Sequence, residues 1–249
     1  MKNLFRNSVF ALLVLSTISV AAQVGGNFNS NDLQSFTVYN TINQNGKVID
    51  LDNLDGSIYL NEDFQPGTII DTEKDQEVKA LLRYNIFKDQ VEINFNKRAN
   101  DINVLKRSTN YKYILNGDYI KLVFNDKIFR GGKDNGYLFI LGNTSAEGNQ
   151  VKLYKKYYQN YTPPRKAKST YEKAKPARLE DAAEYYISQD DKKFTQIETN
   201  KRNILDAFDD QYKSDLKKFI KSKDFKFRGD DKEVENEVRR LVSYYNTLL

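Results

Sequence analysis

Apolar and polar residues alternate along much of residues 36–158, which predicts one short β-strand after another. Residues 78–86 place apolar side chains at every second position, and residues 91–95 do so again after the polar pair Lys88-Asp89. A period of two on both sides of a short polar turn is typical of a hairpin with one buried face. We therefore expect an antiparallel hairpin here.

Asn-Gly pairs mark further turns, because a type I′ turn needs positive φ at both central positions. The chain has three such pairs: Asn45-Gly46, Asn116-Gly117 and Asn135-Gly136. The second pair separates the apolar segments 111–115 and 118–124 and gives the stronger hairpin signal. The other two are expected to punctuate the chain in the same way.

Residues 136–142 are apolar on both faces and predict a central, fully buried strand, and residues 151–158 return after a polar loop. Around ten short strands with hairpin spacing predict a mainly β fold over residues 27–160. An antiparallel sandwich and a small closed barrel both fit this pattern. A transmembrane barrel is the weaker alternative, because the strands are short and the chain ends in helices.

Residues 161–178 are expected to link the β domain to a mostly helical segment at residues 179–249. The linker has three prolines and a run of cations opposed only by Glu172. Prolines and like charges keep a chain extended. The plain interpretation is a solvated tether. The alternative is a basic strip over residues 163–178 that contacts an anionic membrane or a polysaccharide, since each cation near such a surface adds about 1 kcal/mol.

The C-terminal segment predicts one more hairpin and then about three short helices, a small α tail. Residues 185–187 and 194–197 flank a polar stretch and suit the hairpin. Thr199 is a candidate N-cap for the first helix, and Asp230 and Asp231 suit the positive end of the third. The three helices have these apolar faces: Ile204, Leu205 and Phe208; Tyr212, Leu216, Phe219 and Ile220; Val234, Val238, Leu241, Val242 and Tyr245. We interpret the last stripe as a buried face, with a partner-docking helix as the alternative.

Residues 1–22 have the pattern of a secretory signal peptide. Lys2 and Arg6 precede an apolar run at residues 9–20, and a small-residue cleavage site ends at Ala22. A membrane-spanning helix needs about 20 apolar residues, so a retained anchor is the weaker alternative. We expect an exported protein that is periplasmic, associated with the outer membrane or extracellular. It is not expected to be a lipoprotein, because no cysteine follows the cleavage site.

The composition excludes several classes of site. The 249 residues include no cysteine, histidine or tryptophan. Without histidine, Ser-His-Asp and Cys-His triads and imidazole zinc sites are impossible. The 39 Lys and Arg oppose 34 Asp and Glu, a formal net charge of +5. This balance does not predict nucleic-acid binding.

Asp50, Asp52 and Asp55 look like the start of a calcium loop but fail its register. An EF-hand needs acidic ligands at positions 1, 3 and 5, glycine at 6 and glutamate at 12. Counting from Asp50 puts Leu54 at the fifth position and Gly56 at the seventh. We expect a polar turn, with a non-standard calcium site as the alternative. No metal or cofactor site is therefore assigned.

Carboxylate catalysis stays open, because glycoside hydrolysis needs only two acids about 5–10 Å apart. Three acids lie at ordinary strand or turn positions: Glu92, Asp118 and Glu184. Nothing in their context marks any of them as catalytic. The glycines at 131, 132 and 136 resemble a phosphate loop in composition only, since no helix or Walker lysine-serine pair follows, and we interpret them as a turn.

The 17 tyrosines and 15 phenylalanines are the other candidate for binding. Five tyrosines are dense in one region: Tyr154, Tyr157, Tyr158, Tyr161 and Tyr171. Tyrosine-rich surfaces bind sugars and peptides well. The plainer interpretation is that tyrosine forms strands and pairs across them.

Three short motifs resemble a loose group of uncharacterised exported proteins of Gram-negative bacteria. The motifs are Ala21-Ala22-Gln23, Gly56-Ser57-Ile58-Tyr59-Leu60 with Leu82-Arg83-Tyr84-Asn85, and Leu241-Val242-Ser243-Tyr244-Tyr245-Asn246. The resemblance implies export and a β-rich body followed by a helical tail. It brings no known activity, so it assigns no site residue.

Together these features predict an exported, non-enzymatic binding or assembly protein of the cell envelope. Its partner would be an envelope protein or a surface glycan, with peripheral contact to an anionic membrane through residues 163–178. The alternatives are a carboxylate-based glycoside hydrolase and a β-barrel carrier of an apolar ligand. Two facing acids in a deep cleft would favour the hydrolase, and a solidly packed interior would count against the carrier.

Overall fold

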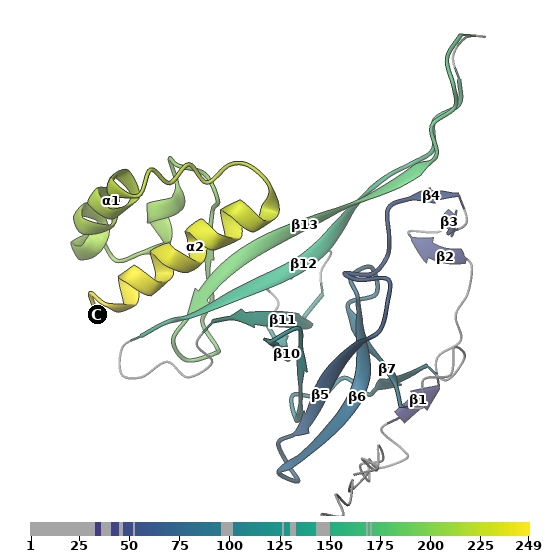
Figure 1. The fold of residues 1–249 in the computed structure, drawn as a ribbon, viewed down its shortest axis with the longest axis horizontal. Helices are drawn as coiled ribbons and strands as arrows, with labels where there is room; N and C mark the ends of the chain where they lie inside the picture. Colours follow the sequence, from purple (N-terminus) through teal and green to yellow (C-terminus); the bar gives the residue numbers. More distant parts are fainter. Residues whose placement is uncertain are drawn as a thin grey trace, which may run out of the picture.

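A computed structural model gives the fold shown in Figure 1. The structure describes residues 33–35, 41–44, 47–51, 53–95, 102–125, 127–129, 133–142, 150–167, 169 and 171–249, with the backbone only for those before residue 51. The expected signal peptide and the Asn45-Gly46 turn lie outside the described residues.

Strands make up most of the regular structure. In chain order they are β1 (Leu33–Ser35), β2 (Thr41–Gln44), β3 (Lys47–Asp50), β4 (Leu54–Asp55), β5 (Gln65–Asp71), β6 (Gln76–Asn85), β7 (Gln90–Asn94), β8 (Asn103–Leu105), β9 (Tyr111–Leu115), β10 (Asp118–Phe124), β11 (Asn135–Leu141), β12 (Lys152–Thr162), β13 (Ala177–Ser188) and β14 (Thr195–Ile197). The prediction of a mainly β chain with a small α tail is confirmed.

Twelve of these strands form one open sheet in the described part of the chain. Neighbours follow the order β1-β8-β7-β6-β5-β9-β10-β11-β12-β13-β14, and β4 lies beside β13. Every pair is antiparallel except β4 with β13. The end strands β1 and β14 are not paired with each other, so the closed barrel that the sequence left open does not form.

The predicted hairpins form. β6 and β7 pair across the Lys88-Asp89 turn, and β13 and β14 pair with Ile187 opposite Thr195. Asn116 and Gly117 have φ of 53° and 86° and join β9 to β10, as a type I′ turn requires. β11 is buried at six of its seven positions, which confirms a central strand.

Gly136 is not a turn residue, and the prediction for the Asn135-Gly136 pair is wrong. Gly136 is the second residue of β11, opposite Val123 of β10. A Cβ atom there would lie 2.5 Å from the Phe129 ring and 3.0 Å from the Asp89 carboxylate. The glycine is needed because a ring and a carboxylate approach the backbone closely, which an Asn-Gly pattern cannot distinguish from a turn.

The helical tail contains two α-helices and two short 3₁₀ turns in place of three helices. These are η2 (Ile204–Ala207), η3 (Asp210–Tyr212), α1 (Lys213–Ser222) and α2 (Asp231–Asn246). Asp230 caps α2 by accepting a hydrogen bond from the Glu233 amide at 2.8 Å, as its position predicted. Thr199 caps no helix. The turn before η2 is made instead by Asn200, whose side chain accepts hydrogen bonds from the amides of residues 202 and 203.

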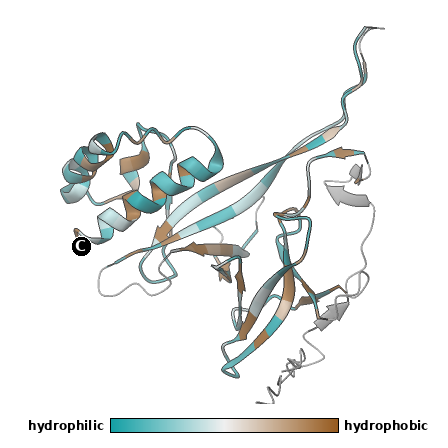
Figure 2. Ribbon diagram, viewed as in Figure 1, coloured by the Kyte–Doolittle hydropathy of each residue, from teal (hydrophilic) through white to brown (hydrophobic). Residues whose placement is uncertain are grey.

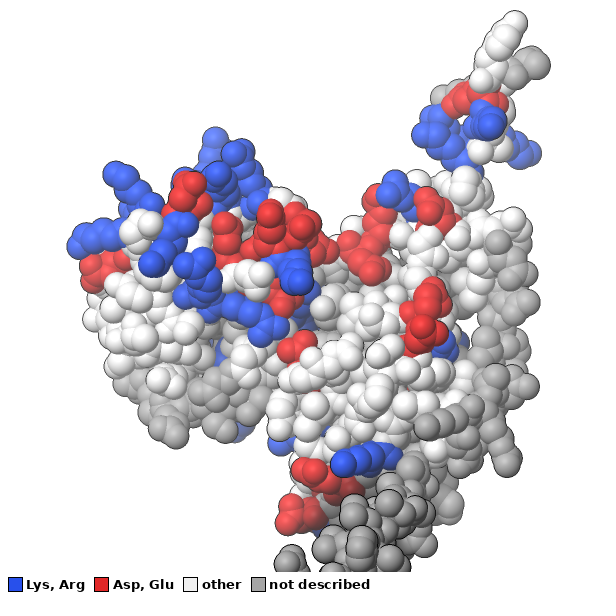
Figure 3. Space-filling model, viewed as in Figure 1, with Lys and Arg blue, Asp and Glu red and all other residues white. Residues whose placement is uncertain are grey.

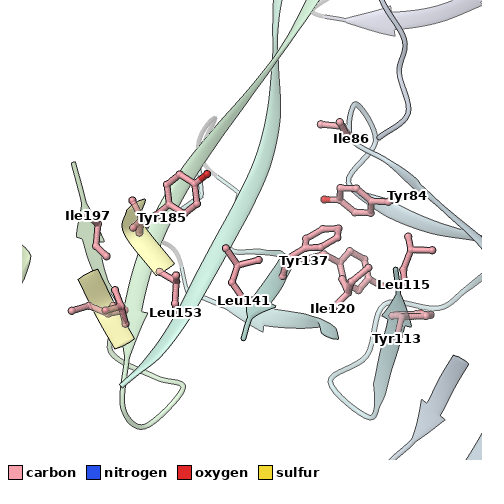
Figure 4. Packing of buried hydrophobic residues seen from close by; sticks show 14 of the residues in the cluster. Tyr84, Ile86, Tyr113, Leu115, Ile120, Tyr137, Leu141, Leu153, Tyr185 and Ile197 are labelled. Carbon is pink, nitrogen blue, oxygen red and sulfur yellow. The ribbon is translucent and has the colours of Figure 1, made fainter. Parts of the chain in front are cut away.

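The helices pack on the sheet and share its core. The apolar stripe of α2 is buried at Val238, Leu241, Val242 and Tyr245, in one cluster with residues of β6, β9, β10 and β11. Figure 4 shows part of this cluster, which continues from Tyr84 and Tyr113 to Tyr185 and Ile197. Figure 2 shows hydrophobic residues in β10 and β11 and hydrophilic ones along much of α2. The tail is therefore part of one folding unit with the sheet.

We predict that Leu241→Ala in α2 destabilises the sheet as well as the helix. Leu241 is fully buried, and removing such a side chain costs about 2–5 kcal/mol of the free energy of unfolding. Urea unfolding followed by circular dichroism should show one transition at lower urea. Asn236→Ala, on the exposed side of α2, should stay within about 0.5 kcal/mol of the natural sequence. A separate early helical transition, with the sheet unchanged, would contradict a shared core.

Candidate functional site

The end of the β12–β13 hairpin extends away from the rest of the protein (Figure 1). The two strands pair from Lys152–Ser188 to Thr162–Arg178, and the backbones of Arg165 and Lys175 continue the ladder with hydrogen bonds of 2.9 and 2.8 Å. Other sheet strands pair with only short parts of it, since β11 stops at Lys155. Beyond Lys155 the hairpin lies against β4, which pairs with Ala177 and Arg178. Its end projects past β4, as Figure 1 shows. We call residues 156–184 the arm and residues 163–176 its tip.

The segment predicted to be a linker, residues 161–178, forms the end of the arm instead. Residues 161 and 162 end β12, and residues 177 and 178 begin β13, so the basic segment doubles back on itself. β13 and β14 fall within the expected helical segment but belong to the sheet. Prolines at both ends of the tip favour an extended backbone, which is found both in tethers and in hairpins. The segment forms a hairpin because β12 pairs with β13 along its whole length.

A buried carboxylate holds the root of the arm. Asp89, in the β6–β7 turn, is 4% exposed. Its Oδ1 accepts hydrogen bonds of 2.5 Å from the Tyr84 hydroxyl and from Lys156 Nζ. Its Oδ2 lies 3.2 Å from Arg107 Nη2, and the Tyr137 amide also donates to the carboxylate. We call these five residues the Asp89 cluster, and its lysine is the first residue of the arm.

The turn around Asp89 explains how this carboxylate comes to point inward. Asp89 has φ of 54°, a left-handed conformation that aspartate tolerates better than most residues. Gly136 leaves the space that the carboxylate occupies. The Arg107 guanidinium also donates to the backbone oxygen of Asp89 at 2.6 Å and to Asn135 at 2.9 Å, which closes the site from outside.

Opposing effects set the protonation of the cluster. Burial alone would raise the pKa of Asp89, but the charge and hydrogen bond of Lys156, the Tyr84 hydroxyl and Arg107 together lower it. Burial lowers the pKa of Lys156 despite the nearby carboxylate, and burial together with Asp89 raises the pKa of Tyr84 well above its ordinary value. The cluster is therefore a desolvated ion pair in which the carboxylate is ionised.

A second contact fixes the side of the arm. Gly56 has φ of 100°, and a Cβ there would lie 2.4 Å from the Leu179 carbonyl oxygen, so only glycine lets the two segments meet. Gln159 donates to the Ser57 carbonyl and, at 2.7 Å, to Asp181. Here Leu179 is buried in a small apolar cluster. The arm is thus held on its flank as well as at its root.

The two central motifs of the resemblance lie side by side at this place. The Leu60 amide donates to the Tyr84 carbonyl at 3.0 Å, and the Ile86 amide donates to the Ile58 carbonyl at 2.9 Å. The Arg83 guanidinium stacks 3.6 Å from the Tyr59 ring centroid. Residues 56–60 and 82–85 therefore form one structural unit against which the arm rests.

The tip combines cations with one fully exposed aromatic ring. The described cations of the tip are Arg165, Lys166, Lys173 and Lys175, and all four are exposed. Glu172, the acidic residue of the tip, is paired with Arg165. Tyr171 is 101% exposed. Figure 3 shows the Lys and Arg side chains at the end of the arm, apart from those of the helical region.

A hollow of about 810 Å³ lies beside the base of the tip. Its lining mixes both charges with prolines: Asp55, Thr162, Pro163, Pro164, Arg165, Lys175, Pro176, Arg178 and Glu180. Arg178 lies 3.5 Å from Asp55 and 3.1 Å from Glu180, so these acids are engaged with it. The hollow is open and has mixed charge, while the tip beyond it is positive.

The acids weighed for catalysis are held in structural contacts. Glu92 is fully buried and lies 2.6 Å from Arg83, its cross-strand partner, and 3.0 Å from Asn85. Glu184 accepts a hydrogen bond of 2.8 Å from the Tyr186 hydroxyl. Each acid sits in a hydrogen bond that joins neighbouring strands or residues, as ordinary strand acids do.

The fold brings Asp118 and Glu235 to the same arginine, Arg239, although nothing in the sequence pattern marks them as a pair. Burial raises the pKa of Asp118. Burial would also raise the pKa of Glu235, but Lys155 and Arg239 lower it. Arg239 lies 3.5 Å from the first and 2.6 Å from the second, and Lys155 lies 2.6 Å from Glu235. Cations thus occupy the space beside both carboxylates, and the network ties α2 to β10 and β12.

The other candidates of the sequence give no site in the described residues. Asp52, Gly131 and Gly132 lie outside them, and Asp55 is exposed. The described residues contain no group of three or more side chains able to hold a metal ion. They also contain no helix long and apolar enough to cross a bilayer.

Of the five clustered tyrosines, Tyr171 alone projects freely. Tyr154 is fully buried and donates to Asp191, and Tyr157 packs edge-on against Phe139 with ring centroids 4.9 Å apart. Tyr158 and Tyr161 are half-buried on β12. The first four tyrosines therefore pack within the sheet as β12 residues, and Tyr171 is the one that stands exposed in the tip.

Comparisons with protein-family models, with curated proteins and with solved structures find no match to this chain.

We predict that Asp89→Asn lowers the free energy of unfolding at neutral pH by about 3–5 kcal/mol, because the largely buried Lys156 would lose its countercharge. Asp75→Asn is the matched control, since Asp75 has a similar φ of 51° in an exposed turn. Urea unfolding of both variants and of the natural sequence gives the comparison.

The pH dependence of this difference has a definite sign. The folded protein holds the pKa of Asp89 below its ordinary value, so its stabilisation is complete above the unfolded pKa of about 3.9 and is lost as the pH falls through the folded pKa. The difference in free energy of unfolding between the natural sequence and Asp89→Asn should be constant from about pH 5 to 7 and should shrink below about pH 4. Equal stabilities throughout this range would refute the role of the cluster.

Proposed function

We propose that the protein is an exported, non-enzymatic binding or assembly protein of the cell envelope that acts through the tip of its arm. The observation that carries this proposal is a projecting hairpin, firmly rooted in the body, that presents exposed cations and an exposed tyrosine at its end. A surface of this kind suits binding to an anionic partner, because it exposes charge and an aromatic ring without enclosing a substrate.

The way the arm is rooted supports a function in binding. Ordering a flexible basic loop on a partner would cost conformational entropy, and preorganisation reduces that cost. The Asp89 cluster and the close approach of Gly56 to Leu179 order the base of the arm when the protein folds, before any partner binds. A solvated tether would gain nothing from a buried ion pair at its base.

The hydrolase alternative has weaker support from the geometry. Asp118 and Glu235 face the same Arg239, and Lys155 contacts Glu235 from the other side. A sugar placed between these carboxylates would have to displace a guanidinium. The carrier alternative required a closed barrel, whereas the sheet is open and tyrosine, phenylalanine and leucine side chains fill its core.

The proposal places the protein in the periplasm, at the outer membrane or outside the cell. It rests here on the N-terminal pattern of residues 1–22 and on the absence of cysteine, which closes the lipoprotein route. Retention at the envelope would then depend on a contact with a membrane, a glycan or a protein. The tip is the part of the described surface that best suits this contact.

We predict that neutralising the tip releases the protein from envelopes. The tip variant carries Arg165→Gln, Lys166→Gln, Lys173→Gln and Lys175→Gln. Full-length protein is expressed in a Gram-negative host, and the fraction that sediments with washed envelopes is measured at low salt. Because each cation adds about 1 kcal/mol near an anionic surface, the bound-to-free ratio should fall at least tenfold.

The matched control removes the same charge from the helical region. It carries Lys217→Gln, Lys218→Gln, Lys221→Gln and Lys223→Gln, all at exposed positions. This variant should sediment like the natural sequence. Equal losses in both variants would show that net charge alone matters, and the proposal that the tip binds would be wrong.

A further inference from the structure

We infer that the tip is a membrane-surface anchor: Tyr171 enters the headgroup region of an anionic lipid bilayer, and the four cations around it bind the lipid phosphates. This inference rests on the proposed function and names the partner of the same site. It commits to a bilayer rather than to a soluble glycan or a protein.

The exposure of Tyr171 is the first argument. Among the described residues the exposed large apolar side chains are Phe124, at 59%, and Tyr171, at 101%. A fully exposed aromatic ring in water gains nothing from packing. Tyrosine has an apolar ring and a polar hydroxyl, so it is suited to the boundary between headgroups and acyl chains.

The charge of the tip is the second argument. Four described cations stand within residues 163–176 against one described carboxylate, Glu172, which is paired with Arg165, so these described residues carry a net charge of +3 (4 − 1). Basic clusters beside an aromatic anchor bind anionic bilayers by combining electrostatic attraction with burial of the ring. The ring alone would hold too weakly, so the cations and Tyr171 must act together.

The shape of the tip separates a bilayer from the other partners. The end of a two-stranded ribbon can reach a flat surface without contact by the body (Figure 1). Prolines at residues 163, 164 and 176 lack amide donors, and proline and lysine on an exposed edge disfavour the addition of a strand from another protein.

The absence of tryptophan from the chain gives a direct test. Tyr171→Trp places a single tryptophan at the tip, and Phe124→Trp places one on the body as a control; each can be excited selectively over the tyrosines. The probes are vesicles of phosphatidylglycerol mixed with phosphatidylcholine, vesicles of phosphatidylcholine alone, and the soluble acidic polysaccharide alginate. We expect the emission of Trp at 171 to shift to shorter wavelength with the anionic vesicles only. Lipids brominated on their acyl chains should quench it.

Salt and charge variants define the expected size of the effect. Lys173→Gln with Lys175→Gln, in the Tyr171→Trp background, should weaken vesicle binding at least tenfold. Raising the ionic strength from about 0.01 M to 0.15 M shortens the Debye length from about 30 Å to 8 Å and should also weaken it. Trp at 124 should respond to none of the probes.

Three results would overturn the inference. One is an unchanged emission of Trp at 171 with anionic vesicles; another is an equal shift with phosphatidylcholine alone. The third is a shift with alginate but not with vesicles, which would make the partner an acidic glycan. If the tip is still needed for sedimentation with envelopes in any of these cases, the proposed function stands and the bilayer is wrong. If sedimentation does not need the tip, the proposed function fails independently.

Discussion

The buried ion pair between Asp89 and Lys156 is the interaction on which the position of the arm depends. A carboxylate that is 4% exposed can stay ionised only if hydrogen bonds and cations replace water around it. Asp89 finds these partners in β6, β11, β12 and the segment before β9. Each partner belongs to a different segment of the chain. The hydrogen bonds and ion pairs to Asp89 therefore hold these four segments in place relative to the β6–β7 turn.

Lys155, the residue before Lys156, forms a second ion pair on the other face of β12. Successive side chains of a strand point to opposite faces, so Lys155 and Lys156 anchor the two sides of one short stretch. Lys155 contacts Glu235 of α2 at 2.6 Å, and although burial would lower its pKa, that hydrogen bond raises it. The helical region and the strand body therefore hold β12 from opposite sides at the start of the arm.

Local pattern was enough to predict the hairpins and the helical stripe. The period of two located β6 and β7, Asn116-Gly117 located a turn, and Asp230 marked the start of α2. These features depend on residues close together in the sequence. The buried Arg83–Glu92 pair was within reach too, because the register of the predicted hairpin places the two opposite each other.

The arm and its root could not be predicted in this way. Lys156 and Asp89 are 67 residues apart, and the turn around Asp89 has the same polar pattern as an exposed one. Gly136 looked like a turn residue because its role comes from Phe129 and Asp89, which approach it from elsewhere in the chain. Residues 161–178 looked like a tether because extended, basic and proline-containing sequence fits a linker and a hairpin tip equally. A partial signal was present in the prolines on both sides of the tip.

The central claim is that the Asp89 cluster holds the arm in one direction relative to the body. The chain has no cysteine, so spin labels can be attached at two introduced sites, Lys173→Cys in the tip and Lys79→Cys in the exposed part of β6. Pulsed electron–electron double resonance then gives the distribution of distances between the two labels. The account predicts one narrow distribution in the otherwise natural sequence and in Asp75→Asn, and a broader one in Asp89→Asn. A distribution that is broad in the natural sequence, or equally narrow in Asp89→Asn, would contradict it.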